Sequence, residues 1–549
     1  MFAADHPPQQ NQSALGALKW GVSWLRPRSL QRPGRILIVL ILICLAKGFV
    51  GAGPIRAYTH DSFATMDGAW RVWNGQRPYA DFYSDPGPLA LIPITLAMNF
   101  SQGVAAINWG ICFLGIIVAL AAVPVVFGRL SAHFATLYCS SLVLLAIAPF
   151  PMGEVPTMGS QGMFYNRSGY ALLGVLLVEC VCTLRDNTRR HGEFLGGVTA
   201  GVAWAIGLFV KFTYGVLGVI LVCATLRLRQ QTRGRWLGIA LGLFAIGTPV
   251  LIFLRFDVVA IIDWLRYMGT TRHVDLLLLV EKSFLATPLL ASVMAFGAAT
   301  AMILRRSGFS RLGRKLIWVL LISGSIDLAA LATNNVHQVA EFRFSALAII
   351  LLVDGLAASV RAQESHHLSQ KVLLVWGITF AVSFPVLDLG GLTVSVVRPL
   401  LQRSRFPQQR IAAAVPDVMI AAEYSKPGGN SPFIEQLNDG IVLLQHDSKP
   451  TEKVAAFLWA NPFPYLLRRP PARGGSLSYD YGANFNDHSS LSGDFAFGGA
   501  DVVMVPKFLE DGSPQLVPHP ILAIYGPFLA SHFVPVGESR FWLLYRHVR

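Results

Sequence analysis

Two adjacent segments decide the fold class: the apolar run ILIVLILICLAKGFVGAG (36–53) and the polar stretch YTHDSFATMDGAWRVWNGQRPYADFYSDPGPLA (58–90). The apolar run contains a single charged residue and has the length of a helix that crosses a bilayer. The polar stretch places four carboxylates and a Pro-Gly-Pro sequence at the end of that helix, the carboxylates being Asp61, Asp67, Asp81 and Asp85. What these carboxylates do there depends on the class of the whole chain.

The composition is that of a membrane protein. Of the 549 residues, 53% are hydrophobic and only 14% are charged, whereas a soluble protein carries about a quarter charged residues. Apolar blocks long enough to cross a bilayer recur along the chain. This recurrence argues against a soluble protein with buried helices and predicts a polytopic α-helical membrane protein.

The net charge of +14 is spread over short loops between the apolar blocks, at 185–190, 227–235 and 305–315, and over the N-terminal segment 19–35. This is the positive-inside pattern of cytoplasmic loops, and it argues against a nucleic-acid partner. The six cysteines all lie in apolar blocks, without disulfide or metal-site spacing. We interpret the first apolar run as a signal anchor, because its basic flank is long for a cleaved signal peptide.

These loops orient a chain of about 11 transmembrane helices, whose expected positions are 36–53, 104–127, 134–150, 167–183, 195–210, 213–226, 236–254, 287–304, 316–333, 344–360 and 372–390. Residues 88–100 are interpreted as a juxtamembrane helix, because a span there would place the arginines of 185–194 outside. The predicted domains are a cytoplasmic segment (1–35), a transmembrane domain (36–395) with its first external loop at 54–103, and an external domain (400–549).

The last 150 residues have a different pattern, with short apolar runs between turn sequences, as in a small α/β domain. We expect strands at GIVLLQHD (440–447), ADVVMVPK (500–507) and RFWLLYRH (540–547). We expect helices at TEKVAAFLWA (451–460) and ILAIYGPFLASH (521–532).

Within the first external loop, Phe63, Met66, Trp70 and Trp73 recur every three or four residues and form one apolar stripe on a helix. Such a helix is expected to lie flat on the membrane with its tryptophans at headgroup level, holding Asp61 at the outer surface. The alternative is an ordinary interfacial loop.

The loop resembles the first external loop of polyprenyl-phosphate-dependent glycosyltransferases of the GT-C superfamily, in particular bacterial relatives of protein O-mannosyltransferases and lipid A aminoarabinose transferases. The resemblance lies in D-x7-A-W-R-x3-G-Q-R-P-Y-x-D-F (61–82), the following Pro-Gly-Pro-Leu, and FYNRSGYALLG (164–174). It implies a GT-C fold in a bacterial inner membrane, with the C-terminal domain periplasmic or extracellular. The implied partners are membrane lipids, a polyprenyl-phosphate-linked sugar and a lipid, glycan or protein acceptor.

The resemblance also implies a catalytic role for Asp61, which matches the aspartate that acts as base in that family. An acceptor hydroxyl is a poor nucleophile and benefits from a carboxylate that takes its proton, whereas phosphate leaves readily. One carboxylate suffices for a single displacement with inversion; a double displacement would need a second one as nucleophile. Many relatives carry Asp-Glu where this chain has Asp61-Ser62, which leaves the role of that glutamate vacant or filled by Asp67, Asp81 or Glu154.

The leaving phosphate needs cations on the outer side, and arginine's planar fork suits phosphate oxygens. The candidates for phosphate binding are Lys211, Arg343, Arg167 and Arg56. The candidates for substrate binding are Asp67, Asp81, Glu154, Asn166, His337 and Glu341. No cofactor is certain, and a divalent metal ion stays open.

Asp327 and Asp354 lie within apolar spans, where carboxylates are functional candidates by default. They support an alternative function, a transporter or flippase of lipid-linked or envelope substrates. Transporters commonly show internal repeats, which this sequence lacks. A non-catalytic membrane scaffold is a third option, but it leaves the aspartates of the loop unexplained.

Overall fold

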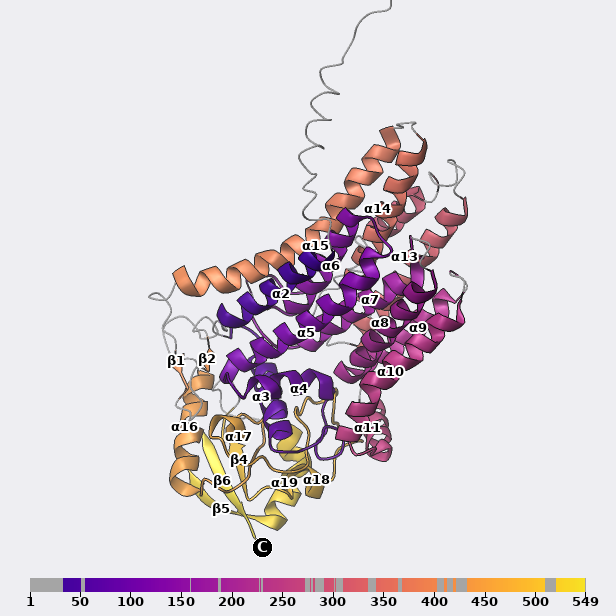
Figure 1. The fold of residues 1–549 in the computed structure, drawn as a ribbon. Coiled ribbons are helices and arrows are strands. Elements are labelled where there is room, and N and C mark those ends of the chain that lie inside the picture. The colour runs from indigo at the N-terminus through magenta and orange to yellow at the C-terminus, as the bar shows by residue number, and fades with distance from the viewer. Residues whose placement is uncertain are drawn as a thin grey trace, which may run out of the picture.

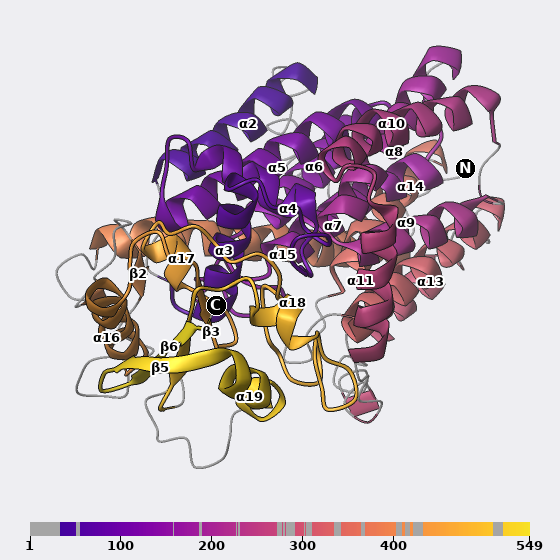
Figure 2. The ribbon, with the colours of Figure 1, turned by 90° about the horizontal axis from the view of Figure 1, so that it is seen from below.

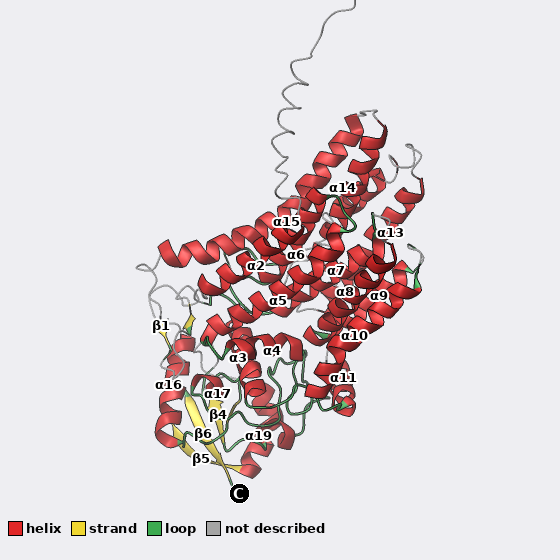
Figure 3. Ribbon diagram, viewed as in Figure 1, coloured by secondary structure: helices red, strands yellow, loops and turns green. Residues whose placement is uncertain are grey.

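The computed structural model describes residues 33–50, 55–157, 159–185, 189–226, 228, 231–271, 277, 280–281, 291–300, 302, 310–333, 342–363, 368–401, 409–411, 418–420, 432–508 and 520–548. It consists of a helical domain and a smaller C-terminal domain that lies against one end of it (Figure 1). The strands of the described chain belong to the C-terminal part (Figure 3).

The helical domain begins with α2 (Pro33–Val50), α3 (Thr59–Trp73), α4 (Pro88–Ala97), α5 (Gly103–Phe127), α6 (Ala132–Ile147) and α7 (Phe164–Val181). It continues with α8 (Arg189–Val210), α9 (Phe212–Thr225), α10 (Arg233–Phe253), α11 (Val258–Thr271), α13 (Ser310–Thr333), α14 (Arg343–Gln363) and α15 (Leu368–Leu401). Apart from α3, α4 and α11, which lie outside the predicted spans, these helices overlap those spans. The predicted span at 287–304 is described only at 291–300 and 302.

Within the described residues, five helical segments are long and apolar enough to cross a membrane by length and composition: Pro33–Val50, Gly103–Phe127, Gly192–Val210, Arg233–Phe253 and Lys371–Val397. Together with the shorter apolar helices they form a multi-pass membrane domain, as the composition predicts. The total of about 11 crossings and the orientation of the loops stay predictions. The segment interpreted as juxtamembrane forms α4, which at ten residues is too short to span a bilayer.

The C-terminal domain contains a four-stranded sheet in the order β3-β4-β6-β5. Its elements are α16 (Pro432–Asp447), β3 (Val454–Ala456), α17 (Phe463–Leu466), α18 (Gly493–Phe497), β4 (Val502–Pro506), α19 (Pro520–His532), β5 (Phe533–Glu538) and β6 (Trp542–His547). A two-stranded ribbon, β1 (Gln409–Arg410) and β2 (Met419–Ile420), precedes it. The predicted class, a polytopic helical membrane protein with a C-terminal α/β domain, is confirmed.

Two predicted elements of this domain are wrong. The run 440–447 is not a strand but the second half of α16, whose buried Ile434, Leu437, Ile441 and Leu444 recur every three or four residues. That period appears only when the window begins upstream of Gly440.

The second error concerns 451–460, which is not a helix. Its centre is β3, which pairs in parallel with β4 and is buried at all three positions. A fully buried parallel strand reads as a continuous apolar run, without the alternation that marks a half-exposed strand. Its alanines favour a helix, and tertiary packing overrides that preference.

Helices α3 and α4 lie between α5 and the C-terminal domain (Figures 1 and 2). The apolar stripe of α3 is therefore divided between two environments. Phe63 and Met66 are covered by protein, and the ring centroid of Phe63 lies 6.1 Å from that of Phe433. Trp73, at the other end, remains 42% exposed.

Candidate active site

The main pocket lies where α3, the start of α7 and the C-terminal domain meet, and encloses about 690 Å³ of empty space, part of it open to solvent. The helical domain contributes Asp61, Ala64, Thr65, Asp85, Pro86, Met163, Tyr165, Asn166 and Lys211. The C-terminal domain contributes Trp459, Leu477, Ser478, Asp480, Ala483 and Asn484. The pocket thus brings together Asp61, Asn166 and Lys211 from the predicted set, and adds Asp85.

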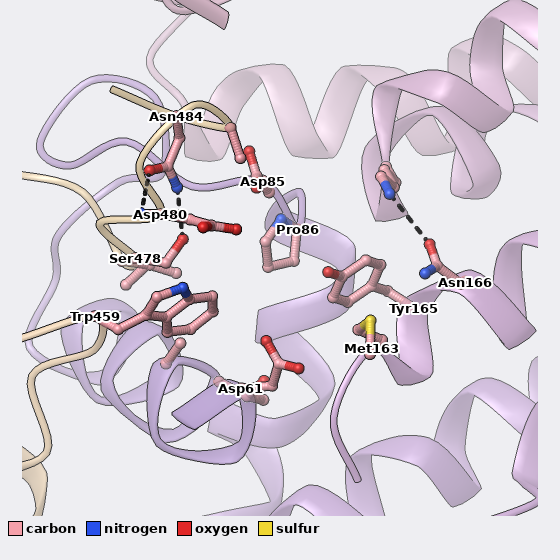
Figure 4. A pocket seen from close by; sticks show the side chains of 15 residues that line it. Asp61, Asp85, Pro86, Met163, Tyr165, Asn166, Trp459, Ser478, Asp480 and Asn484 are labelled. Atoms are coloured by element: carbon pink, nitrogen blue, oxygen red, sulfur yellow. Dashed lines mark hydrogen bonds between the residues drawn. The ribbon is translucent and has the colours of Figure 1, made fainter. Parts of the chain in front are cut away.

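Asp61 sits in the first turn of α3, and its carboxylate points into the pocket (Figure 4). The side chain is only 12% exposed. Gly162 leaves room for it, because a Cβ added there would lie 3.0 Å from the Cβ of Asp61. Burial, and then the nearby carboxylates of Asp480 and Asp85, raise the pKa of Asp61 from 3.8 to about 7.

His60, next to Asp61, does not neutralise this carboxylate. The His60 Nε2 atom lies 4.0 Å from the Asp61 Oδ2 atom. Burial lowers the pKa of His60 from 6.5 to about 4, so the imidazole is neutral near pH 7. Its ring instead packs edge-on against Trp459, with the centroids 4.5 Å apart.

Lys211 forms the cationic part of the pocket, at the junction of α8 and α9. Its Nζ atom donates a hydrogen bond to Asn166 Oδ1 at 3.2 Å, and the Tyr214 hydroxyl donates to the same oxygen at 3.1 Å. The Nζ atom also lies 5.2 Å from the centroid of the Tyr165 ring, which is within the range of a cation–π contact. The ammonium is therefore held at the pocket wall by α7.

The Pro-Gly-Pro sequence fastens Asp85 and Pro86 to this junction. Gly87 N donates to Val210 O at 2.8 Å, one residue before Lys211. A Cβ on Gly87 would lie 2.2 Å from Phe209 O, so only glycine allows this approach. The loop that carries the carboxylates and the helix end that carries the ammonium are thereby locked together.

The C-terminal wall of the pocket is a loop that follows α17. In it, Asn484 Nδ2 donates to Ser478 Oγ at 2.7 Å, and Asp480 N donates to Asn484 Oδ1 at 2.7 Å (Figure 4). Sequence reasoning missed these residues. A usable signal was the composition of SLSYDYGANFND (476–487), which combines aromatic residues, aspartate and asparagine as residues 58–90 do.

This loop is positioned by residues 67–83 of the helical domain. Arg71 donates from Nε to Asp67 Oδ2 at 2.8 Å and from Nη1 to Ala472 O and Gly474 O at 2.9 and 3.0 Å. Leu477 N donates to Tyr83 O at 2.9 Å. Ser478 and Asp480 follow directly, so the docking contacts set the position of the pocket wall.

Several predicted site residues do not line the pocket. Asp67 is fully buried against Arg71, and Asp81 binds Arg77 and Arg473. Glu154 accepts a hydrogen bond from the Tyr58 hydroxyl at 2.6 Å, and the backbone N–H of Arg56 donates to Gly159 O at 2.8 Å.

Arg167 and Arg343 share another partner, Asp388 on α15, whose two oxygens lie 3.0 and 2.9 Å from them. Arg343 and Asp388 line a separate cavity of about 260 Å³. His337 and Glu341 lie outside the described residues.

The two carboxylates within the spans cap helices. Asp327 accepts hydrogen bonds from the backbone N–H groups of Phe344 and Ser345 at the start of α14. Asp354 accepts from Ser131, which precedes α6, and pairs with Arg185. These contacts satisfy N–H groups at helix starts, so both carboxylates have a structural role that requires no transport function.

The described residues contain no group of three or more His, Cys, Asp or Glu side chains arranged to hold a metal ion.

Fold and pocket define a multi-pass helical membrane protein whose C-terminal α/β domain closes an acidic pocket at one end of the helical domain. No family model matches the sequence, and no curated protein does either. The chain is similar to the crystal structure of ArnT from Cupriavidus metallidurans in the apo state, with 14% identity and a TM-score of 0.39, over 93% of this chain and 97% of that one.

The chain is also similar to the archaeal oligosaccharyltransferase AglB from Archaeoglobus fulgidus in complex with an inhibitory peptide and a dolichol-phosphate. Here the identity is 11% and the TM-score 0.29, over 86% of this chain and 69% of that one. Both TM-scores are below 0.5, so neither similarity supports a conclusion about function. The function proposed for this chain rests instead on the residues of the pocket.

Proposed function

We propose that the protein is a membrane glycosyltransferase that moves a sugar from a polyprenyl-phosphate-linked donor to an acceptor hydroxyl on the external face. The observation that carries the proposal is one pocket with a buried carboxylate of raised pKa, Asp61, and a held ammonium, Lys211. A proton acceptor and a phosphate-binding cation are the two groups that this reaction needs. The resemblance of residues 61–89 to the GT-C loop supports the same reaction.

In the proposed mechanism, the acceptor hydroxyl binds beside Asp61 and attacks the anomeric carbon of the donor sugar. The new carbon–oxygen bond forms as the bond to the phosphate oxygen breaks, and Asp61 takes the hydroxyl proton. Polyprenyl phosphate leaves with the bonding electron pair, and Lys211 stabilises its negative charge. A single displacement of this kind inverts the anomeric centre.

The raised pKa of Asp61 suits a general base. A base works best when its pKa lies near the working pH, because it is then partly ionised and also holds the proton well. A pKa of about 7 meets both conditions, whereas an exposed aspartate, at about 3.9, would accept the proton weakly.

The first prediction concerns pH. If Asp61 must be ionised, kcat/KM should rise with pH through about 7 and then level off. Asp480→Asn removes one of the negative charges that raise the pKa of Asp61, so it should move the midpoint to lower pH. Initial rates between about pH 5 and 9 measure both curves. A flat profile in the parent protein would contradict a base with this pKa.

The second prediction concerns Lys211. Lys211→Ala should raise the KM for the lipid-phosphate donor by about tenfold to a hundredfold, the usual value of a charged hydrogen bond, and change the acceptor KM little. Lys371→Ala, at an exposed lysine of α15, is the matched control and should leave both constants unchanged. Equal, small changes in the KM for the donor and the KM for the acceptor would indicate that Lys211 has only a structural role.

Mass spectrometry of envelope glycolipids and glycans can test the function in cells. Strains that carry the parent gene, no gene and Asp61→Asn should be compared. We expect a sugar-modified product that is present only with the parent gene. A product that survives in the Asp61→Asn strain, or substrate that accumulates on one side of the membrane without any modification, would favour the transport alternative.

A further inference from the structure

A second cavity lies on the opposite side of α3 from the main pocket. It encloses about 500 Å³ of empty space, and Trp70, Trp73, Met98, Tyr465 and Arg468 line it. We call it the indole cavity. Trp70 follows Asp61 by nine positions, and at about 100° per residue this places the two side chains on opposite faces of the helix.

The indole cavity lies at the level where a membrane span ends. Gln102, which also lines it, immediately precedes Gly103, the first residue of the candidate span α5. The Gly103 N–H donates to the Tyr465 hydroxyl at 2.6 Å, which ties the C-terminal domain to the end of that span. The cavity therefore opens at the depth of lipid headgroups.

The surface around the cavity has the composition of a membrane interface. Leu96 and Phe100 are 56% and 61% exposed. The ring of Trp109 lies between Phe100 and Phe49, at centroid distances of 5.5 and 5.0 Å. Aromatic side chains gather in this way where a protein leaves the bilayer, because their rings suit the boundary between hydrocarbon and water.

The indole cavity is positively charged, which favours an anionic ligand. Arg468 is exposed, and the residues that line the cavity include no carboxylate. The backbone of Arg468 has a φ of 52°, which is uncommon for arginine. A hydrogen bond from Arg468 N to Tyr465 O, 3.1 Å long, stabilises this conformation. A guanidinium at the headgroup level of an aromatic surface suits a lipid phosphate.

We propose that the indole cavity binds the headgroup of an anionic phospholipid from the external leaflet. Its phosphate contacts Arg468, its glycerol region packs against Trp73 and Met98, and its acyl chains leave past Leu96 and Phe100. This site is distinct from the main pocket and does not depend on the proposed reaction. It anchors α3, the helix that carries Asp61, to the membrane surface.

Native mass spectrometry of the full-length protein in detergent, titrated with phosphatidylglycerol or phosphatidylcholine, tests the proposal. We expect the parent protein to bind phosphatidylglycerol more tightly. Arg468→Gln should lower this affinity about tenfold, the loss of one charged hydrogen bond, and Trp73→Ala should also weaken it. Arg540→Gln, at an exposed arginine elsewhere on the same domain, should change nothing.

The competing outcomes are distinguishable. Equal binding of the two lipids, or unchanged binding in Arg468→Gln, would overturn the proposal. Displacement of phosphatidylglycerol by millimolar inorganic phosphate would show a site for free phosphate and would overturn it as well. Arg468 and Trp73 are both exposed. Arg468→Gln and Trp73→Ala should therefore keep the thermal stability of the parent protein, which distinguishes lost binding from misfolding.

Discussion

Asp61→Asn is expected to lower the rate of sugar transfer by about 10²–10⁴-fold, the usual contribution of a positioned general base. Asparagine has nearly the same size and can still form hydrogen bonds, but it cannot take a proton near neutral pH. Donor binding should be almost unchanged, because the phosphate is assigned to Lys211. Single-turnover rates at saturating donor measure the chemical step separately from binding.

The same pocket provides matched controls. Asp61→Glu keeps a carboxylate and should lose less activity than Asp61→Asn. Asp85→Asn and Asp480→Asn remove carboxylates that line the pocket and should each cost less than Asp61→Asn. If Asp480→Asn were inactive while Asp61→Asn transferred sugar at nearly the parent rate, the base would be on the C-terminal wall.

Thermal stability gives an independent readout for Asp61→Asn. The folded pKa of about 7 lies above the unfolded value of 3.8, so the carboxyl group costs stability as pH rises through this interval. The variant removes that cost, and its apparent Tm at pH 8 should exceed that of the parent protein. The gain should shrink as the pH is lowered towards about 4. Lost activity with a raised Tm would exclude misfolding as the cause.

Arg71→Met is expected to destabilise the protein by about 3–5 kcal/mol, because it leaves the carboxylate of Asp67 buried without its partner. It also removes the hydrogen bonds to Ala472 O and Gly474 O that dock the C-terminal domain. The loop that carries Ser478 and Asp480 should then become susceptible to proteolysis, and transfer activity should fall with it. Limited proteolysis followed by peptide mapping measures the docking directly.

The double variant Asp67→Leu/Arg71→Met tests the cause of this effect. It removes both charges, so it should recover much of the stability lost in Arg71→Met. Activity should recover less, because the contacts to the C-terminal loop are still missing. If the double variant were as unstable as the single one, the buried charge of Asp67 would not be the cause.

The membrane architecture could be predicted from the sequence because bilayer thickness dictates the length and composition of each span. The helices α5, α7, α9 and α10 accordingly begin and end within about three residues of the predicted spans. The helices and strands of the C-terminal domain were harder to predict, because short apolar runs such as 440–447 and 451–460 suit a buried strand or a buried helix equally well. Their partners in the fold, rather than their own residues, decide between the two.

The candidate site could be predicted only in part. The pattern of residues 61–89 indicated Asp61, and Lys211 was a candidate because it is a cation between the predicted spans 195–210 and 213–226. The sequence indicated Asp67 and Asp81 as substrate-binding candidates, although each has an arginine four residues away. On α3 the spacing of Asp67 and Arg71 is that of an ion pair on one helical turn, whereas Arg77 and Asp81 form their pair in the loop after α3. That spacing distinguishes paired carboxylates from Asp61, which has no such partner in sequence.

The C-terminal wall of the pocket could not be predicted from sequence. Trp459 and Asp480 lie about 400 positions from Asp61. The docking of residues 469–477 on residues 70–83 brings them together. Long-range contacts of this kind leave no local period in the sequence. The C-terminal domain therefore supplies one wall of the proposed active site.

The most direct test of the central claim is the donor dependence of the purified protein. In detergent or liposomes, with an acceptor-containing envelope lipid extract, a polyprenyl-phosphate-linked sugar should be consumed and free polyprenyl phosphate should be released in step with a glycosylated product. Asp61→Asn should release almost none. Transfer that is supported only by nucleotide sugars, or transfer from the lipid-linked donor that is undiminished in Asp61→Asn, would contradict the account.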